Sequence, residues 1–312
     1  MKILVTGGAG FIGSHIVDAY ITLGHEVVVV DNLITGQRKN LNPQAKFYEL
    51  DIRFAELRDL VAAEAPDIIN HQAAQMNIRQ SVIAPCFDAE NNILGSINLL
   101  EAACAAKVQH FIFASSGGAI YGEHDYLPAD EDHPLRPLSP YGIAKLAIEK
   151  YLDYYRVVQG LYSISLRYAN VYGARQNPKG EAGVIAIFCE KLLRGESPTI
   201  NGNGFQTRDY IYIDDVVQAN ILALDYRSDD VHIFNIGTSL ETHLNDIFAL
   251  LKDIIKLDIQ SLYGEAKLGE QMRNVLDIKR AAAYLGWKPQ VSLAKGLRYT
   301  LAAYRREFYN IL

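Results

Sequence analysis

The chain has 312 residues, 49% hydrophobic and 21% charged, which is the balance of a globular protein with a sizeable core, and its net charge of −6 argues against nucleic acid as a partner. Its three cysteines, Cys86, Cys104 and Cys189, lie too far apart for a zinc motif or a disulfide framework, and its eight histidines are scattered, so no metal is expected. No apolar run reaches about 18 residues and the N-terminus shows no leader pattern, so we expect a cytoplasmic protein that does not contact the membrane.

Short apolar runs rich in β-branched residues alternate with longer amphipathic segments. We expect strands at Lys2–Thr6, Glu26–Asp31, Lys46–Glu49, Ile68–His71, His110–Ser116, Ser163–Arg167 and Ile233–Ile236. Helical patterns lie between the first six, at Phe11–Leu23, Phe54–Ala65, Pro85–Ala106 and Pro140–Gln159. This alternation predicts an α/β fold of the Rossmann type, a doubly wound parallel sheet with helices on both faces.

The alternation ends after Arg167, where turn signals such as Asn201-Gly202-Asn203-Gly204 appear. Further helices are expected at Val184–Arg194, Val216–Leu224, Leu244–Leu251 and Leu293–Tyr309, with Asp214 and Asp215 capping the one at Val216. We therefore expect residues 1–173 to form the sheet domain, with 209–238 returning to it. Residues 174–312 would form a smaller, partly interleaved C-terminal lobe.

A glycine-rich loop, TGGAGFIG, joins the first strand to the first helix. Its glycines, Gly7, Gly10 and Gly13, permit a tight turn and the close approach of a pyrophosphate. The helix that begins near Phe11 would direct its free N–H groups and the positive end of its dipole at the phosphates. Because the loop follows a strand and opens a helix, it predicts a dinucleotide-binding site.

Two acidic residues near strand ends are candidate contacts of the dinucleotide, and the first of them bears on the choice between NAD and NADP. Asp31 ends the second strand, where a carboxylate can accept hydrogen bonds from both ribose hydroxyls and would repel a 2′-phosphate, so NAD is favoured over NADP. The alternative is that Asp31 only caps a loop. Asp51, after the third strand, is placed to reach the adenine amino group.

The segment SPYGIAK carries Tyr141 and Lys145 four residues apart, so a helix would place both on one face. A phenol titrates near pH ~10, and bringing its pKa to about 7 requires roughly 4 kcal/mol. One ammonium about 4 Å away supplies that at an effective dielectric of about 20, and an oxidised nicotinamide adds positive charge. Tyr141 would then serve as acid and base while a hydride leaves the same carbon of the substrate.

With these motifs in place, the chain resembles the extended short-chain dehydrogenase/reductase family, and within it the UDP-glucose 4-epimerase branch. The resemblance covers nearly the whole chain and includes HQAAQ at His71–Gln75, SSGGAIYGE at Ser115–Glu123, LRYANVYGARQ at Leu166–Gln176 and RDYIYIDD at Arg208–Asp215. It implies NAD as the cofactor, a UDP-sugar as the substrate, and a homodimer through the Pro85–Ala106 and Pro140–Gln159 helices.

The resemblance also implies site residues. The cofactor contacts would be Gly7, Gly10, Phe11, Ile12, Gly13, Asp31, Asn32, Asp51, Ile52, Gln72, Ala73, Ala74, Gln75, Asn92, Tyr141, Lys145 and Tyr168. Asn92 would also hold the Gln72–Gln75 loop in place, and Tyr168 would border the nicotinamide. The substrate contacts would be Ser116, Gly117, Asn170, Val184, Asn201, Arg208 and Arg273, the two arginines clamping the diphosphate.

One position departs from the family pattern. The family usually has Ser or Thr four residues before the tyrosine of its xYG motif, and here that position is Gly117. We expect Ser116, or a water, to supply the missing hydrogen bond to the reacting oxygen, which adds Ser116 to Tyr141 and Lys145 as a catalytic residue. The related 4,6-dehydratases carry an Asp-Glu pair where this chain has Gly118 and Ala119, so water elimination is not expected.

The expected reaction is NAD-dependent epimerisation at C4 of a UDP-hexose, UDP-glucose or UDP-galactose, through a 4-keto intermediate. Two other substrates stay open: UDP-glucuronate, if Arg175 meets its carboxylate, and a UDP-N-acetylhexosamine, if Asn274 leaves room beside C2. A non-catalytic NAD-binding regulator is a remote alternative that only Gly117 favours.

Overall fold

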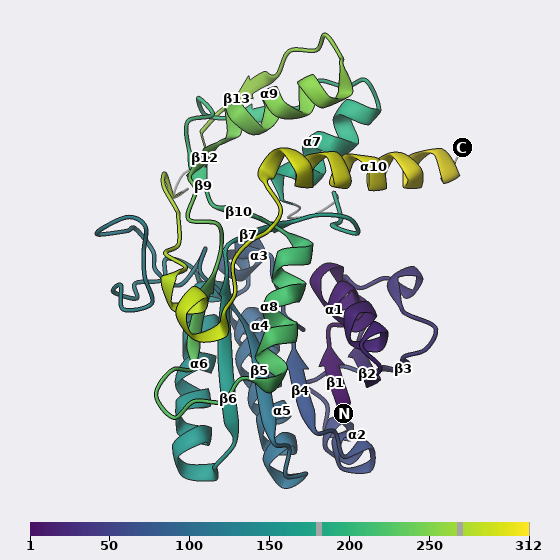
Figure 1. The fold of residues 1–312 in the computed structure, drawn as a ribbon, viewed down its shortest axis with the longest axis vertical. Coiled ribbons are helices and arrows are strands. Elements are labelled where there is room, and N and C mark those ends of the chain that lie inside the picture. Colours follow the sequence, from purple (N-terminus) through teal and green to yellow (C-terminus); the bar gives the residue numbers. More distant parts are fainter. Residues whose placement is uncertain (179–182, 267–270, 312) are drawn as a thin grey trace.

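The computed structural model describes residues 1–178, 183–266 and 271–311. Seven parallel strands form the central sheet in the order β11-β6-β5-β4-β1-β2-β3 (Figure 1). They are β1 Lys2–Thr6, β2 Glu26–Asp31, β3 Lys46–Glu49, β4 Ile68–His71, β5 His110–Ser116, β6 Tyr162–Tyr168 and β11 Ile233–Ile236. The strand order reverses at β1 and β4, which opens a crevice at their carboxyl ends. The predicted Rossmann-type fold is confirmed.

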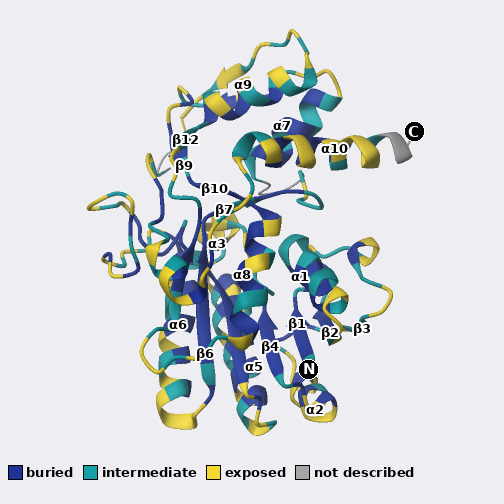
Figure 2. Cartoon of the chain, in the orientation of Figure 1, coloured by how far each residue is buried: buried dark blue, intermediate teal, exposed yellow. Residues whose placement is uncertain are grey.

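Helices cover both faces of the sheet. Helices α1 (Phe11–Thr22) and α8 (Ile213–Asp225) pack on one face, and α2 (Glu56–Glu64), α5 (Gly95–Ala105) and α6 (Pro140–Gln159) pack on the other. Successive residues of β1 serve opposite faces, with Ile3 and Val5 in one hydrophobic cluster and Leu4 in the other. Figure 2 shows the strands buried between these two layers.

The connection from β4 to β5 differs from the single helix expected at Pro85–Ala106. It runs through α3 (Ile78–Ile83), which was not predicted, then α4 (Pro85–Ala89), a π-helical turn at Glu90–Leu94, and α5. The Ser96 hydroxyl, in the first turn of α5, donates to the carbonyl of Asn92 in the π-helical turn at 2.6 Å. Wide turns of this kind often lie at functional sites because they turn a side chain inward.

The smaller lobe has its own hydrophobic core. Helices α7 (Val184–Leu193), α9 (Leu244–Ile255) and α10 (Leu293–Ile311) enclose Phe188, Ile247 and Leu251. Its short strand pairs are β8 (Thr199–Asn201) with β13 (Leu262–Gly264), and β9 (Thr207–Arg208) with β12 (Thr242–His243). Strands β7 (Asn170–Tyr172) and β10 (Tyr210–Tyr212) pair between this lobe and the sheet (Figure 1). The domain boundary at residue 173 stays a prediction.

The expected caps of α8 are wrong. The helix begins at Ile213 with Tyr212 as its N-cap, so Asp214 and Asp215 lie inside the first turn. There the Asp215 carboxylate accepts hydrogen bonds from the backbone N–H groups of Gln290 at 2.8 Å and Val291 at 3.1 Å. Asp215 therefore anchors the chain segment that leads into α10.

Candidate active site

The glycine loop lies at the carboxyl end of β1, beside the loop that follows β4. Gly7 has φ +70°, and a Cβ added there would come within 2.7 Å of the Ala73 nitrogen, so the loop tolerates no side chain at that position. Gly10 caps α1 without a side-chain hydrogen bond, which leaves the first N–H groups of α1 available at this edge. The side chains of Phe11 and Ile12 pack into the core of the smaller lobe.

Asp31 holds the glycine loop against the end of β2. Its buried carboxylate accepts hydrogen bonds from the Ala9 N–H at 2.9 Å and from the Leu33 N–H at 2.8 Å. Burial raises the pKa of Asp31, whereas these two bonds lower it. The residue therefore caps a loop, as the alternative interpretation has it, and its contact with a ribose stays a prediction.

The Asp51 carboxylate accepts hydrogen bonds from two neighbouring side chains. Although burial opposes its charge, hydrogen bonds from Arg53 and Asn32 bring its pKa to about 2. Arg53 donates from Nε at 2.9 Å and from Nη2 at 2.8 Å, and Asn32 Nδ2 donates at 2.8 Å. Ile52 between them is buried in the core, and its carbonyl accepts from Asn98 at 2.8 Å. The carboxylate is thus ionised and fixed in place next to Asn32.

The loop after β4 is fixed by Asn92 in the π-helical turn. Asn92 Oδ1 accepts from the Gln75 N–H at 2.8 Å, and Asn92 Nδ2 donates to the Gln75 carbonyl at 2.8 Å. Asn92 Nδ2 and Gln75 Nε2 also both donate to Asp88 Oδ1 at 2.9 Å. The structure therefore gives Asn92 the loop-holding position that was expected for it.

His71 ties the same loop to β1. Its Nδ1 lies 2.7 Å from the Thr6 hydroxyl and its Nε2 lies 2.9 Å from the Ser96 hydroxyl, and the Ala73 N–H donates to Thr6 Oγ1 at 3.2 Å. Burial, with a contribution from the charge of Lys145, lowers the pKa of His71 to about 3. The imidazole is therefore neutral and links β4 to β1 through Thr6 and to α5 through Ser96.

The polar groups of Gln72 and Tyr168 point into a buried hydrogen-bond network. Gln72 Nε2 donates to Asn70 Oδ1 at 2.6 Å and lies 3.3 Å from the Tyr168 hydroxyl, which also accepts from Asn220 Nδ2 at 2.8 Å. Burial raises the pKa of Tyr168 to about 12, so its hydroxyl stays protonated. These contacts fix the ring of Tyr168 where β6 ends.

Tyr141, Lys145 and Ser116 come together where α6 begins and β5 ends. The Ser139 hydroxyl accepts from the Gly142 N–H at 3.2 Å as the N-cap of α6, and Pro140 occupies the first turn. The Lys145 ammonium lies 5.7 Å from the centre of the Tyr141 ring and donates to the Ala114 carbonyl at 2.7 Å. The Ser116 side chain hydrogen-bonds Tyr141, whereas its expected hydrogen bond to the reacting oxygen stays a prediction.

The free protein does not make this phenol acidic. Burial raises the pKa of Tyr141 to about 12, against the lowering effect of the Ser116 hydrogen bond. Burial also lowers the pKa of Lys145 to about 8. In the free protein desolvation dominates the pKa of Tyr141. The expected lowering by the ammonium together with an oxidised nicotinamide stays a prediction. A further positive charge is required to ionise Tyr141 near pH 7.

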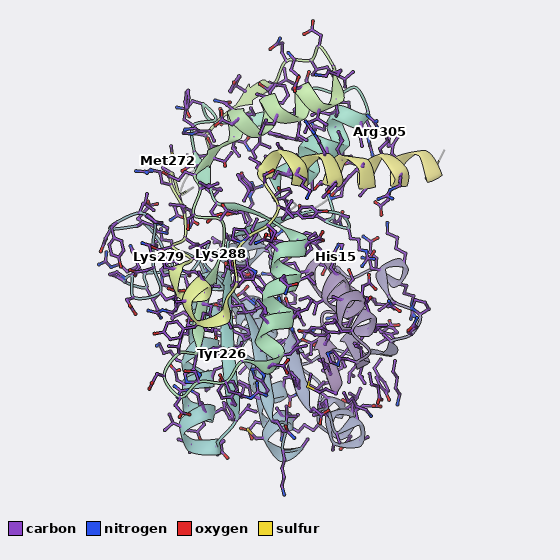
Figure 3. All side chains as sticks on the ribbon, in the orientation of Figure 1. His15, Tyr226, Met272, Lys279, Lys288 and Arg305 are labelled. Atoms are coloured by element: carbon purple, nitrogen blue, oxygen red, sulfur yellow. The ribbon has the colours of Figure 1, made fainter. Side chains whose placement is uncertain are left out.

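The structure leaves no room for a side chain at residue 117, because another residue fills that space. A Cβ added to Gly117 would lie 2.5 Å from Leu276 Cδ1, and the Gly117 carbonyl faces Asn274 Nδ2 at 3.4 Å. Leu276 and Asn274 belong to the segment that descends from Met272 toward Lys279 between the two lobes (Figure 3). This segment packs at Gly117 against the Ser116–Tyr121 segment, named the catalytic loop here for its predicted role.

The predicted substrate residues occupy different surroundings. Asn170 Oδ1 is buried without a hydrogen-bond partner among the described residues, close to Gly118 and 3.9 Å from a Cβ added there. Val184 begins α7, and Asn201 ends β8, where its carbonyl accepts from Gln206 at 2.9 Å. Asn170 is therefore the one that shares the catalytic loop's surroundings and leaves an acceptor open there.

The two arginines expected to clamp a diphosphate have protein partners. Arg273 forms a bidentate ion pair with Glu241, with Nε 2.8 Å from Oε1, and Glu241 also accepts from the Thr207 hydroxyl at 2.7 Å. Arg208 Nη1 donates to the Thr207 carbonyl at 2.7 Å. Both lie near β9 and β12, so a substrate diphosphate would have to compete with Glu241 for Arg273.

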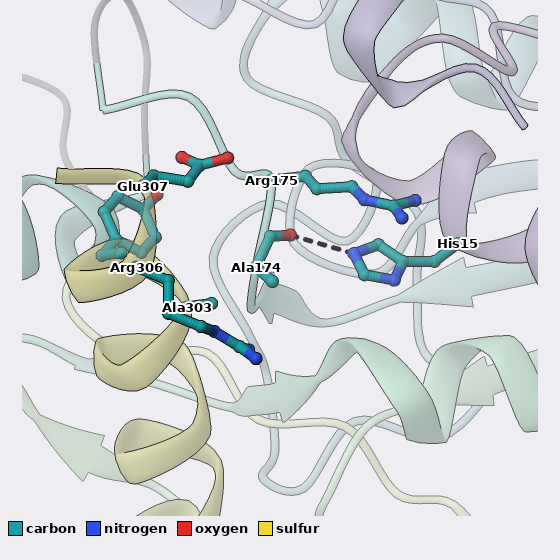
Figure 4. Close-up of a pocket in the computed structure, with 7 residues that line it drawn as sticks. His15, Ala174, Arg175, Ala303, Arg306 and Glu307 are labelled. Carbon is teal, nitrogen blue, oxygen red and sulfur yellow. Dashed lines mark hydrogen bonds between the residues drawn. The ribbon is translucent and has the colours of Figure 1, made fainter. Parts of the chain in front are cut away.

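Arg175 has a carboxylate partner on α1. Its Nη2 pairs with Asp18 of α1 at 2.7 Å, and it lines a pocket with His15, Tyr304 and Arg306. Figure 4 shows Arg175 and His15 across from Arg306 of α10. The pairing with a nearby acid is the simpler alternative for a loop arginine, and it removes the reason to expect a contact with a C6 carboxylate.

A buried ion pair behind the site was missed by sequence reasoning. Arg167 on β6 donates to Glu149 on α6 from Nε at 2.9 Å and from Nη2 at 2.7 Å, and both side chains are 1% exposed. Ser115 donates to the same carboxylate at 2.6 Å, and Arg167 Nη1 donates to the Tyr121 hydroxyl at 2.9 Å. The spacing Tyr141, Lys145, Glu149 was the available signal, because all three lie on one face of α6.

None of the helices within the described residues has the length and apolarity needed to cross a membrane. Across the same residues, no three His, Cys, Asp or Glu side chains gather as metal ligands would.

Known proteins share both the sequence and this architecture. Residues 3–237 match the NAD dependent epimerase/dehydratase family. The chain is 41% identical to the UDP-glucose 4-epimerase of Mycolicibacterium smegmatis, over 98% of this chain and 99% of that protein. It is 47% identical to the UDP-glucose 4-epimerase of Thermotoga maritima crystallised with UDP-glucose (TM-score 0.97, 99% and 100% covered), and 40% identical to that of Thermus thermophilus in complex with NAD (TM-score 0.92, 98% and 99% covered). The chain belongs to the NAD dependent epimerase/dehydratase family.

Proposed function

We propose that this protein is an NAD-dependent UDP-hexose 4-epimerase that interconverts UDP-glucose and UDP-galactose. The observation that carries the proposal is the convergence of Tyr141, Lys145 and Ser116 at the sheet edge where the glycine loop opens α1. Relatives that match the chain over nearly its full length, and that are named UDP-glucose 4-epimerases, support it.

The residues at this edge fit the cofactor. The uncapped first turn of α1 offers N–H groups to a pyrophosphate, and Asp31 stands at the end of β2 where a ribose would lie. When bound there, NAD supplies a hydride acceptor and donor, together with the positive charge that the free site lacks for ionising Tyr141. A non-catalytic regulator is disfavoured, because the side chains of Tyr141, Lys145 and Ser116 that the proton chemistry requires are all in place.

Tyr141 performs the proton chemistry in this proposal. It removes the proton from the 4-hydroxyl of the sugar while the hydrogen at C4 leaves as hydride. Ser116 hydrogen-bonds the phenol and keeps it aimed at the reacting oxygen. Once the 4-keto sugar has turned to present its other face, the hydride returns to C4 and Tyr141 gives the proton back. The cofactor is unchanged overall and stays bound between turnovers.

The choice of sugar rests on the surroundings of Gly117. Asn170 leaves an unpartnered acceptor there, and Asn274 is a small side chain, so a UDP-N-acetylhexosamine remains a second candidate substrate. UDP-glucuronate loses its support, because Arg175 is paired with Asp18 of α1.

The test compares turnover of UDP-galactose, UDP-N-acetylglucosamine and UDP-glucuronate by the purified holoenzyme. We expect UDP-galactose to be the best substrate. Tyr141→Phe should lose the activity and keep bound NAD, whereas Tyr151→Phe, an exposed position on the same helix, should keep both. Near-normal turnover by Tyr141→Phe, or no epimerisation of any of the three sugars by the wild type, would overturn the proposal.

The quaternary structure is part of the same proposal. Exposed apolar side chains continue from α3 and α4 onto α6, which pack against each other: Ile78, Val82, Ile83, Phe87, Ile143, Tyr151, Tyr154, Val157 and Val158. Apolar surface of this extent is typical of an interface, and we take its occupant to be a second copy of the chain. We place the protein in the cytoplasm, which its three free cysteines support.

A further inference from the structure

Asp88 on α4 is a buried carboxylate, and one of its two oxygens has no hydrogen-bond partner among the described residues. The residue is 1% exposed, and its Oδ1 accepts from Gln75 Nε2 and from Asn92 Nδ2, both at 2.9 Å. Its Oδ2 is buried and has no hydrogen-bond partner within the part of the chain that the structure describes. Because an unpaired buried oxygen of an ionised group is costly, holding the Gln75 loop does not account for a carboxylate rather than an amide at this position.

Asp88 lies on a helix that packs against the catalytic helix. Helix α4 packs against α6, and the Asp88 carboxylate interacts electrostatically with both Tyr141 and Lys145. Lys145 is 5% exposed, lies over the Phe113 ring with Nζ 4.8 Å from its centre, and donates to the Ala114 carbonyl. An ammonium in such an apolar setting requires negative charge nearby to stay protonated.

The other ionisable groups around Lys145 contribute less negative charge than Asp88 does. Glu149, one turn further along α6, also raises the pKa of Lys145, by less than Asp88, and its carboxylate accepts two hydrogen bonds from Arg167. His71 on β4 has its pKa lowered to about 3 by burial and is neutral. Tyr141 is neutral until it ionises. Asp88 is therefore the carboxylate that acts most strongly on the Lys145 ammonium, and its Oδ2 has no hydrogen-bond partner among the described residues.

We propose that Asp88 is the counter-ion of Lys145, a positioning residue that keeps the ammonium charged inside the buried site. The role rests on the proposed function, because it matters to turnover only if Lys145 assists Tyr141. The carboxylate raises the pKa of Lys145, and it raises the pKa of Tyr141 as well. The pKa values of Lys145 and Tyr141 thus both depend, in part, on one residue of a neighbouring helix.

A stability cycle tests the pairing without any turnover. Asp88→Asn keeps an Oδ1 acceptor for Gln75 and Asn92 and removes the charge. In the wild-type background we expect it to lower the Tm of the holoenzyme at pH 7. In a Lys145→Met background, where Asp88 faces no cation, we expect the same substitution to raise the Tm. Equal shifts of the same sign in both backgrounds would overturn the proposal, whether or not the protein proves to be an epimerase.

A pH profile then tests the consequence for catalysis. Removing the Asp88 charge lowers the pKa of both Lys145 and Tyr141, so both limbs of the plot of log kcat against pH should move to lower pH in Asp88→Asn. Asn92→Ala, which releases the Gln75 loop and keeps the charge, is the matched control and should lower kcat with both limbs in place. Limbs of Asp88→Asn that coincide with those of the wild type would contradict the proposal.

Discussion

The Leu276 side chain occupies the place where a side chain of residue 117 would lie, with Cδ1 2.5 Å from an ideal Cβ. The family usually has a hydroxyl residue at that position, but here Leu276, which is distant in sequence, leaves no room for one. This chain has a hydroxyl one position earlier, on Ser116, which hydrogen-bonds Tyr141.

We therefore expect Gly117→Ser to destabilise the protein and not to improve it. Overpacking of a filled site costs about 1–3 kcal/mol, and the free energy of unfolding measured with denaturant should fall by that amount. Gly118→Ser is the matched control, because a Cβ there meets nothing closer than 3.8 Å. Adding Leu276→Ala to Gly117→Ser should return part of the loss, and a purely additive double mutant would show that the two positions do not compete.

Loss of the hydroxyl that is present should impair catalysis. Ser116→Ala removes a hydrogen bond that lowers the pKa of Tyr141, so the phenolate becomes rarer and the acid limb of the kcat profile should move to higher pH. A hydrogen bond to a charged group contributes about 1.5–3 kcal/mol, which corresponds to a fall in kcat of roughly 10- to 100-fold.

Ser115→Ala is the control for this experiment, because its hydroxyl donates to Glu149 at 2.6 Å and does not serve Tyr141. The acid limb of Ser115→Ala should stay where it is in the wild type. A Ser116→Ala enzyme with the kcat and pH profile of the wild type would assign the hydrogen bond to another group, such as a water.

The sheet could be predicted from the sequence because each strand is a local apolar run, and all seven appear where they were expected. The Tyr141–Lys145 pair followed from helical spacing, and the loop-holding role of Asn92 followed from its place in a motif. These features depend on residues within a few positions of one another.

Features that depend on distant contacts could not be predicted. The partner of Arg175 is Asp18 and the partner of Arg273 is Glu241, and no local pattern joins either pair. The pKa of Tyr141 in the free protein could not be predicted for a similar reason, because the sequence shows the ammonium four residues away but not the desolvation of the site. The π-helical turn at Glu90–Leu94 also escaped, since its residues read as an ordinary helix.

Acid should destabilise the protein through His71. Its pKa is about 3 in the folded state and about 6.5 when unfolded, so the unfolded chain takes up the proton first as the pH falls below 6.5. Stability that is present above pH 6.5 is therefore lost progressively toward pH 3, by about 3 kcal/mol at pH 4. His71→Gln, which cannot take up that proton, should flatten the dependence of the free energy of unfolding on pH between 6.5 and 4. Parallel curves for the two proteins would show that His71 does not carry this dependence.

Charged substitutions on the exposed face of α6 should disrupt the proposed dimer. Ile143 and Val157 are 53% and 74% exposed, and a charge at each would have to be buried against the second copy if that face is the interface. Burying an unpaired charge costs several kcal/mol, so Ile143→Glu combined with Val157→Lys should convert a dimer into a monomer in light scattering coupled to gel filtration. Substituting Leu23→Glu, an exposed position at the end of α1, should leave the molar mass unchanged. A wild-type protein that elutes as a monomer at micromolar concentration, or an Ile143→Glu Val157→Lys variant that stays dimeric, would place the interface elsewhere or show that there is none.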